Sequence, residues 1–226
     1  MSEFGGEREE MSSLEMLKHC SQLHSIQLCG FQTRFLWCLG MRPQFTTGLV
    51  SLDLSRCSGL DDMSLCAILE PAQSLNKLNV AETYVSDHCM PRIAALPNLA
   101  ELNLREARQI SESGIMQLLV DEDGCTRETK LRKLVVTGCD FTDTLFRLDW
   151  GRLEELTAAN GSPNAMGSNT ALLLDRGPRR ISLAGSRNLV SVLTPGAGAF
   201  AASWLLLLNL SGCKNLKEVR VVVPIL

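Results

Sequence analysis

The chain has 226 residues, of which 45% are hydrophobic, and a formal net charge of −3. This length and composition predict one ordinary folded domain, and the slightly acidic balance argues against a protein that binds nucleic acid or an anionic membrane, since such proteins usually carry a basic patch. The nine cysteines include no C-x-x-C pair, so they indicate free thiols in an intracellular, reducing compartment, with the cytoplasm as first expectation and an organelle as alternative, rather than a disulfide framework.

The first 22 residues are expected to precede the main fold. Residues 1–11 are polar and predict a disordered tail. They do not contain a basic segment followed by an apolar run, so the sequence gives no indication of a secretory signal. Residues 12–22 open with Ser12-Ser13-Leu14-Glu15, which has the spacing of a capping box. We therefore predict a short helix over 12–22 that covers the apolar edge of the next segment.

A repeated apolar pattern runs through residues 23–221. Its template is apolar-x-x-apolar-x-apolar-x-x-Cys/Asn-x-(x)-apolar, as in Leu49–Leu60. Eight copies begin at Leu23, Leu49, Leu75, Leu99, Leu131, Leu153, Pro178 and Leu205. Their starts lie 26, 26, 24, 32, 22, 25 and 27 residues apart, which indicates a solenoid built from one small unit. Residues 222–226 would then form a C-terminal tail.

The chain resembles the leucine-rich repeat family, and most closely its cysteine-containing subclass, which occurs in many F-box proteins. The cysteine stands in three copies, as Cys57, Cys139 and Cys213. An apolar residue followed by hydroxyl or acidic residues comes next in Leu60-Asp61-Asp62, Val85-Ser86-Asp87, Ile110-Ser111-Glu112 and Phe141-Thr142-Asp143. The resemblance covers roughly residues 12–221 and implies an α/β solenoid, or horseshoe, of about eight repeats with a parallel concave sheet and convex helices.

The template positions have physical reasons. Alternation along a short strand sends both residues of an L-x-L pair into one core shared by neighbouring repeats. The cysteine falls where the chain leaves the strand, where a small buried group able to make a weak hydrogen bond fits. The Asp or Ser after it can cap a return helix. We expect such helices over 62–70, 87–96 and 111–120, the second bent or shortened by Pro91.

Two apolar regions exceed what the template needs. Residues 31–48 hold several large apolar side chains, and residues 188–213 contain no charge. The second stretch is long enough to span a membrane, but its end fits the repeat phase, so we expect no membrane insertion. We expect instead an apolar outer surface that a partner covers. The apolar residues expected to contact a partner are Phe35, Trp37, Phe200, Trp204, Val222, Val223 and Ile225.

The concave face follows from the residues that flank the core leucines. Those expected to contact a partner protein are Asp53, Arg56, Lys77, Asn79, Glu82, Glu101, Asn103, Arg105, Lys133, Glu155, Arg180 and Asn209. Both signs of charge mix among them, so neither an anionic nor a cationic ligand is favoured. The face has small residues toward its C-terminal half and no large aromatic side chain.

No motif for chemistry occurs. The chain has no G-x-S-x-G, Walker loop, G-x-G-x-x-G or H-E-x-x-H motif, so we expect no enzyme, cofactor, metal site or small-molecule substrate. The prediction is a non-catalytic protein–protein interaction scaffold, a structural or assembly subunit of a larger intracellular complex. The alternative, implied by the resemblance to F-box proteins, is the substrate-recognition module of a ubiquitin-ligase adaptor, although residues 1–22 are too short to hold an F-box.

Overall fold

The computed structural model describes residues 22–31, 36, 46–120, 127–139, 152–159, 170–173, 178–187, 189–195 and 205–222. The predicted tail 1–11 and all but the last residue of the predicted helix 12–22 lie outside this part of the chain. The predicted apolar contacts Phe35, Trp37, Phe200, Trp204, Val223 and Ile225 also lie outside the described residues. Val222 ends a strand.

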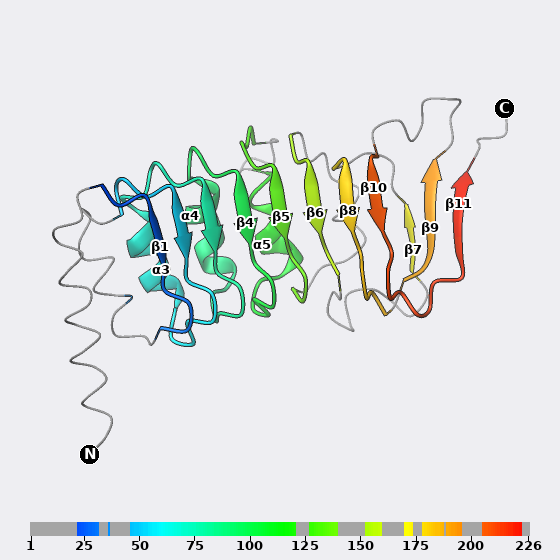
Figure 1. The fold of residues 1–226 in the computed structure, drawn as a ribbon, viewed down its shortest axis with the longest axis horizontal. Helices are drawn as coiled ribbons and strands as arrows, with labels where there is room; N and C mark the ends of the chain where they lie inside the picture. Colours follow the sequence, from blue (N-terminus) through cyan, green and yellow to red (C-terminus); the bar gives the residue numbers. More distant parts are fainter. Residues whose placement is uncertain are drawn as a thin grey trace, which may run out of the picture.

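Eight short strands form one parallel sheet in chain order (Figure 1). They are β1 (Ser25–Gln27), β2 (Ser51–Asp53), β3 (Lys77–Asn79), β4 (Glu101–Asn103), β5 (Lys133–Val135), β6 (Glu155–Thr157), β8 (Arg180–Ser182) and β10 (Leu207–Asn209). Each strand begins two residues after the first apolar residue of one template copy. The template therefore predicted the place of every strand in this sheet.

The middle residue of each strand forms one apolar column in the core. Neighbouring strands are in register, so that Leu52, Leu78 and Leu102 follow one another across the sheet. These side chains are at most 2% exposed, and they join the next template leucines in one continuous cluster. The solenoid core is thus a stack of identical layers, each closed by its neighbours.

The return segments of the central repeats are helical. They contain α3 (Asp62–Leu69), the 3₁₀ turn η3 (Asp87–Cys89) followed by α4 (Met90–Ala94), and α5 (Glu112–Met116), and Figure 1 shows the α-helices together behind the strands of the N-terminal half. The first two predicted helices are confirmed, and the second is divided into a 3₁₀ turn and an α-helix shortened to five residues, with Pro91 in the first turn of that helix. The third predicted helix was too long. After Met116 the hydrogen bonds join residues three apart, from Leu118 N–H to the Ile115 carbonyl and from Leu119 N–H to the Met116 carbonyl, as in a 3₁₀ turn.

The later return segments are strands, which corrects the expectation of convex helices throughout. After β6, β8 and β10 come β7 (Thr170–Leu173), β9 (Leu189–Pro195) and β11 (Glu218–Val222), which form a second parallel sheet in the order β11-β9-β7. Valine is frequent in β9 and β11, and β-branched side chains favour strands. The uncharged stretch 188–213 thus contains β9 and β10, and no helix among the described residues is long and apolar enough to cross a membrane.

The template cysteines lie at the predicted corner. Each thiol donates to a backbone carbonyl of the preceding repeat: Cys57 to Leu28 (3.0 Å), Cys139 to Leu104 (3.1 Å) and Cys213 to Leu183 (3.2 Å). The bond runs between repeats, so the cysteine ties the turn of one layer to the strand end of the layer before it.

The predicted helix caps are also present. Asp61, Ser86 and Ser111 are the N-caps of α3, η3 and α5. Asp61 Oδ1 accepts from Ser64 N–H at 2.7 Å, and the hydrogen bonds from Ser64 lower the pKa of the Asp61 carboxyl. These caps satisfy backbone N–H groups that a helix start would otherwise leave unpaired.

Candidate functional site

Two columns of side chains cover the concave face of the eight-stranded sheet. The first column is the first residue of each strand: Ser25, Ser51, Lys77, Glu101, Lys133, Glu155, Arg180 and Leu207. The last column is the last residue of each strand: Gln27, Asp53, Asn79, Asn103, Val135, Thr157, Ser182 and Asn209. Nine predicted contact residues lie in these columns. The sequence analysis missed Val135 and Leu207 because it looked for polar side chains.

The first column is a ladder of ion pairs between neighbouring strands. Lys77 pairs with Glu101 at 2.6 Å, and Lys133 pairs with Glu155 at 3.3 Å. The side chains are about half exposed, so each pair adds little to stability. These ion pairs leave the carboxylates of Glu101 and Glu155 with cationic partners. Arg180, the next residue of the column, has no carboxylate partner among the described residues.

Four predicted contact residues of the last column have a structural role. Asp53, Asn79, Asn103 and Asn209 each accept a hydrogen bond from the backbone N–H two residues later, at 2.9, 3.1, 3.0 and 3.0 Å. This Asx turn closes the strand end. Between Asn103 and Asn209 the column holds Val135, Thr157 and Ser182, which leaves a patch of small side chains in the middle of the face.

The other three predicted contact residues, Arg56, Glu82 and Arg105, lie in the turns after β2, β3 and β4. Arg56 pairs with Glu82 at 3.1 Å. Both have positive φ (59° and 58°), a conformation that the corresponding turns of other repeats fill with Gly30, Gly138, Gly185 and Gly212. Left-handed backbone disfavours side chains, so this ion pair stands on turns that glycine would fit better.

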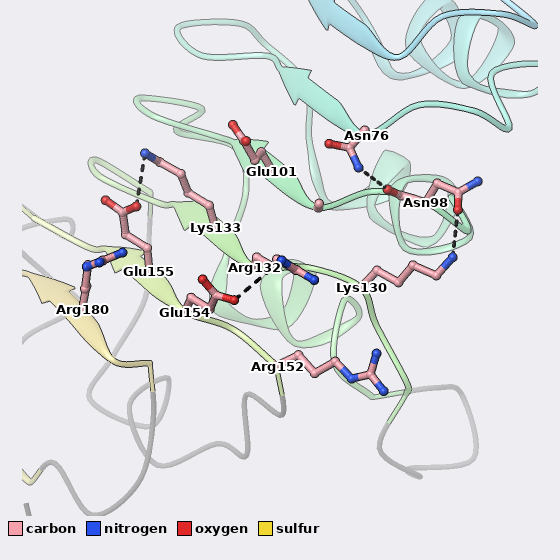
Figure 2. A pocket seen from close by; sticks show the side chains of 11 residues that line it. Asn76, Asn98, Glu101, Lys130, Arg132, Lys133, Arg152, Glu154, Glu155 and Arg180 are labelled. Carbon is pink, nitrogen blue, oxygen red and sulfur yellow. Dashed lines mark hydrogen bonds and ion pairs between the residues drawn. The ribbon is translucent and has the colours of Figure 1, made fainter. Parts of the chain in front are cut away.

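A hollow of about 560 Å³ opens where strands β4, β5, β6 and β8 begin (Figure 2). Its lining consists of strand-first residues and of residues just before the strands: Asn76, Asn98, Ala100, Glu101, Lys130, Arg132, Lys133, Arg152, Glu154, Glu155 and Arg180. The sequence analysis predicted only Glu101, Lys133, Glu155 and Arg180 of this set. The charged residues it missed flank the first leucine of copies five and six, as in K-L-R-K-L and R-L-E-E-L, and this shared phase was the available signal.

The hollow contains more cationic than anionic groups. Arg132 lies 3.8 Å from Glu154, and the ammonium of Lys130 donates to the amide oxygen of Asn98 at 2.8 Å. Figure 2 shows Arg180 beside Glu155, with no bond drawn to Arg180 or to Arg152. A second, smaller hollow of about 240 Å³ lies over strands β1–β5, where Lys77 and Lys133 of the first column are already paired with glutamates.

Comparison with protein-family models and with curated proteins finds no match. Among solved structures, 33 chains match. One is an internalin (inlF) from Listeria monocytogenes, with a TM-score of 0.50 and 14% sequence identity over 92% of this chain and 70% of that chain. Another is TLR13 in a complex with ssRNA13, with a TM-score of 0.49 and 18% identity over 90% of this chain and 36% of that one.

The internalin and TLR13 are both leucine-rich repeat proteins. At these identities the likeness speaks for the fold alone, since one fold carries many functions. Together with the eight-stranded parallel sheet, the likeness to the internalin shows that this chain folds as a leucine-rich repeat solenoid. It gives no support for the narrower F-box-associated subclass.

Proposed function

We propose that this chain is a non-catalytic protein–protein interaction scaffold, working as a structural or assembly subunit of a larger intracellular complex. The observation that carries the proposal is the concave face of eight strands. Its side chains are held in place before any partner arrives, by the ion pairs of the first column and the Asx turns of the last column. A surface whose side chains are already ordered loses less conformational entropy on binding.

The non-catalytic part of the proposal is supported by the chemistry of the larger hollow. Its three carboxylates, Glu101, Glu154 and Glu155, each already pair with a lysine or arginine. General acid–base catalysis requires a proton-transferring group that can reach a substrate, and paired carboxylates on an open sheet are poorly arranged for that. Within the described ranges, no cluster of three or more His, Cys, Asp or Glu could hold a metal ion.

The test is purification of the tagged native protein from its own cells, with mass spectrometry of what survives a high-salt wash. Salt weakens exposed electrostatic contacts more than buried apolar ones. Ser182→Arg places a long side chain in the small patch of the concave face. Met63→Arg, on a 77% exposed side chain of α3, adds the same residue to the opposite face as a matched control.

We expect a stoichiometric set of partners with the unchanged protein and with Met63→Arg, and its loss with Ser182→Arg. Partners that remain in full amount with Ser182→Arg would contradict binding through the concave face. The absence of any stoichiometric, salt-resistant partner would contradict the subunit proposal.

The alternative function is a substrate-recognition module of a ubiquitin-ligase adaptor. The observation in its favour is that Cys57, Cys139 and Cys213 each donate a hydrogen bond to the preceding repeat. These bonds explain why a cysteine would be needed at the template position that is typical of the F-box-associated repeats. The same purification separates the two functions. Ubiquitin-ligase components recovered with sub-stoichiometric partners would favour the adaptor over the permanent subunit.

A further inference from the structure

We infer that the larger hollow binds an acidic segment of a partner protein, one in which an apolar side chain lies next to carboxylates. This inference rests on the proposed function, since it names the chemistry of the partner at one part of the concave face. It is carried by the charge balance of the hollow and by a partly apolar pocket that adjoins it.

The hollow is cationic although the whole chain is acidic. Five lysines and arginines and three glutamates line it, against a net charge of −3 for the chain. All three glutamates are already paired, Glu101 with a lysine that lies outside the hollow. Lys130, Arg152 and Arg180 have no carboxylate partner among the described residues, so three cations remain available to a ligand.

The available cations suit carboxylate groups. Arg152 and Arg180 are exposed, and a guanidinium presents paired N–H groups that match a carboxylate in a bidentate arrangement. Lys130 is held by Asn98 at 2.8 Å, which positions its ammonium without neutralising it. A partner segment with two or three carboxylates would complement these three positions.

A partly apolar pocket of about 170 Å³ adjoins the hollow, and Lys130 lines both. Its walls include the apolar residues Ile93, Leu96, Leu99, Leu118 and Leu131 and the charged residues Arg127 and Glu128. The apolar side chains pack on the solenoid core, so the pocket can hold an apolar side chain that leaves water.

The arrangement favours a protein segment over a nucleic acid. A continuous phosphate backbone would pass Glu101, Glu154 and Glu155, which alternate with the cations along the strand starts. The lining also contains no aromatic side chain on which bases could stack. A peptide can place its carboxylates at intervals and an apolar side chain between them.

The test is direct binding of a fluorescein-labelled peptide with four glutamates on each side of one leucine, measured by fluorescence anisotropy in low salt. Arg152→Glu combined with Arg180→Glu reverses both free arginines. Lys214→Glu combined with Lys217→Glu makes the same change of net charge on exposed residues outside the hollow. Circular dichroism is used to check that both double variants keep the fold.

We expect the arginine double variant to bind the peptide at least about tenfold more weakly, which is one decade in Kd, and the lysine double variant to bind within about twofold of the unchanged protein, as expected for charges outside the site. Replacing the peptide leucine by alanine should weaken binding several-fold. Equal loss in both double variants would mean a non-specific charge effect and would overturn the inference. So would tighter binding of a labelled RNA oligonucleotide that the arginine variant abolishes.

The same variants separate this inference from the proposed function. If native partners are lost with Ser182→Arg but retained with the arginine double variant, the scaffold function stands and the acidic-segment inference fails. If the peptide binds as expected while native partners are retained with Ser182→Arg and with the arginine double variant, the hollow binds acidic segments but the native partners do not bind through the concave face. If the peptide binds as expected and no stoichiometric native partner is recovered at all, the scaffold proposal fails.

Discussion

Cys139 illustrates how one side chain of the repeat couples packing to ionisation. Its thiol is fully buried and donates to the Leu104 carbonyl at 3.1 Å. Burial raises the pKa of this thiol to about 12, because the low-polarity surroundings disfavour the thiolate. Only the thiolate reacts with alkylating reagents, so the same burial that completes the corner also protects it.

This burial predicts a loss of stability at high pH. The pKa of the Cys139 thiol in the folded protein is raised above its ordinary value of 9.0, so the contribution of this thiol to stability is complete below pH 9 and is lost as pH rises from 9 toward 12. Urea unfolding of the protein and of Cys139→Ala at several pH values measures it. The stability difference between them should be constant from pH 6 to 8 and should shrink above pH 9.

Cys57 and Cys89 also have raised pKa values, so the comparison with Cys139→Ala is needed to isolate one thiol. Alkylation provides a second readout: the exposed Cys29 should react at pH 8 in the folded protein while Cys139 does not. A stability difference that stays unchanged to pH 11, with Cys139 reacting as fast as Cys29, would contradict the prediction.

For single residues, the sequence predicted where a side chain lies in the repeat better than which hydrogen bond that side chain makes. The corner of Cys139 followed from the template. The Asx turns of Asn79 and Asn103 did not, because strand alternation says which face a side chain takes but not whether a backbone N–H two residues later will bind it.

The return segments of the central repeats are joined by a ladder of serine–aspartate contacts. Ser86 donates through its backbone N–H and its hydroxyl to Asp62, at 2.7 and 2.6 Å. Ser111 does the same to Asp87, at 2.8 and 2.6 Å. Each N-cap serine is thus held by the aspartate of the preceding repeat, and the helix starts are spaced by these bonds.

Gly114 makes room for the second step of this ladder. A Cβ added to this buried residue would overlap the Asp87 carboxylate. Gly114→Ala should therefore lower the free energy of unfolding by about 1–3 kcal/mol, since displacing Asp87 leaves the partly buried donors of Ser111 unpaired. Helix propensity alone predicts the opposite sign, a gain of about 0.8–1 kcal/mol.

Urea unfolding monitored by circular dichroism measures the change at Gly114. The matched control is Ser113→Ala, one residue earlier in α5, where the side chain is exposed and the change should be within about 0.5 kcal/mol. If Gly114→Ala were as stable as the control or more stable, the steric role of the glycine would be wrong.

Among the helices and strands, the sequence pattern predicted α3 but not the pairing of β9 with β11. The capped helix α3 was predicted almost to the residue, because Asp61 and the apolar spacing agree. The strands β9 and β11 were not assigned to a second sheet. Valine alternation such as V-S-V and V-R-V favours a strand, but the pairing of β11 with β9 depends on register between repeats. The family resemblance instead favoured helices.

Across the whole molecule, each repeat is stabilised mainly by its two neighbours. Leu134 of β5 lies in register between Leu102 and Leu156 and is fully buried. Leu208 holds the same place in β10 but is only half-buried, with Ile181 as its registered neighbour. In a stack of layers, burial and cross-strand bonds both depend on having a neighbour on each side.

The hollow is a whole-molecule feature that the sequence analysis did not assemble. Lys130, Arg152 and Arg180 belong to three different repeats and are separated by 22 and 28 residues. Lys130 and Arg152 both directly precede the first leucine of their template copies, which is the available signal that they lie together, whereas Arg180 is the first residue of its strand. The predicted contact residues came from the strands and from the turns after them, and not from the positions just before the strands, where Lys130 and Arg152 lie. The charges were interpreted as balanced because a sequence does not show which carboxylates are already paired.

The layered core predicts that one substitution has different effects at different layers. Leu134→Ala should lower the free energy of unfolding by about 2–5 kcal/mol, as for other buried leucines, and Leu208→Ala by less than half of that amount, because its site is already partly open to water. Urea unfolding measures both changes, and hydrogen exchange locates them. The Leu210 N–H, which has no backbone acceptor among the described residues, should exchange faster than those of Leu54 and Val136, which bond to Asn79 and Thr157 at 2.8 Å. Equal losses of stability at the two leucines, with uniform exchange along the sheet, would mean that the repeats unfold as one unit whose stability does not depend on the number of neighbouring layers.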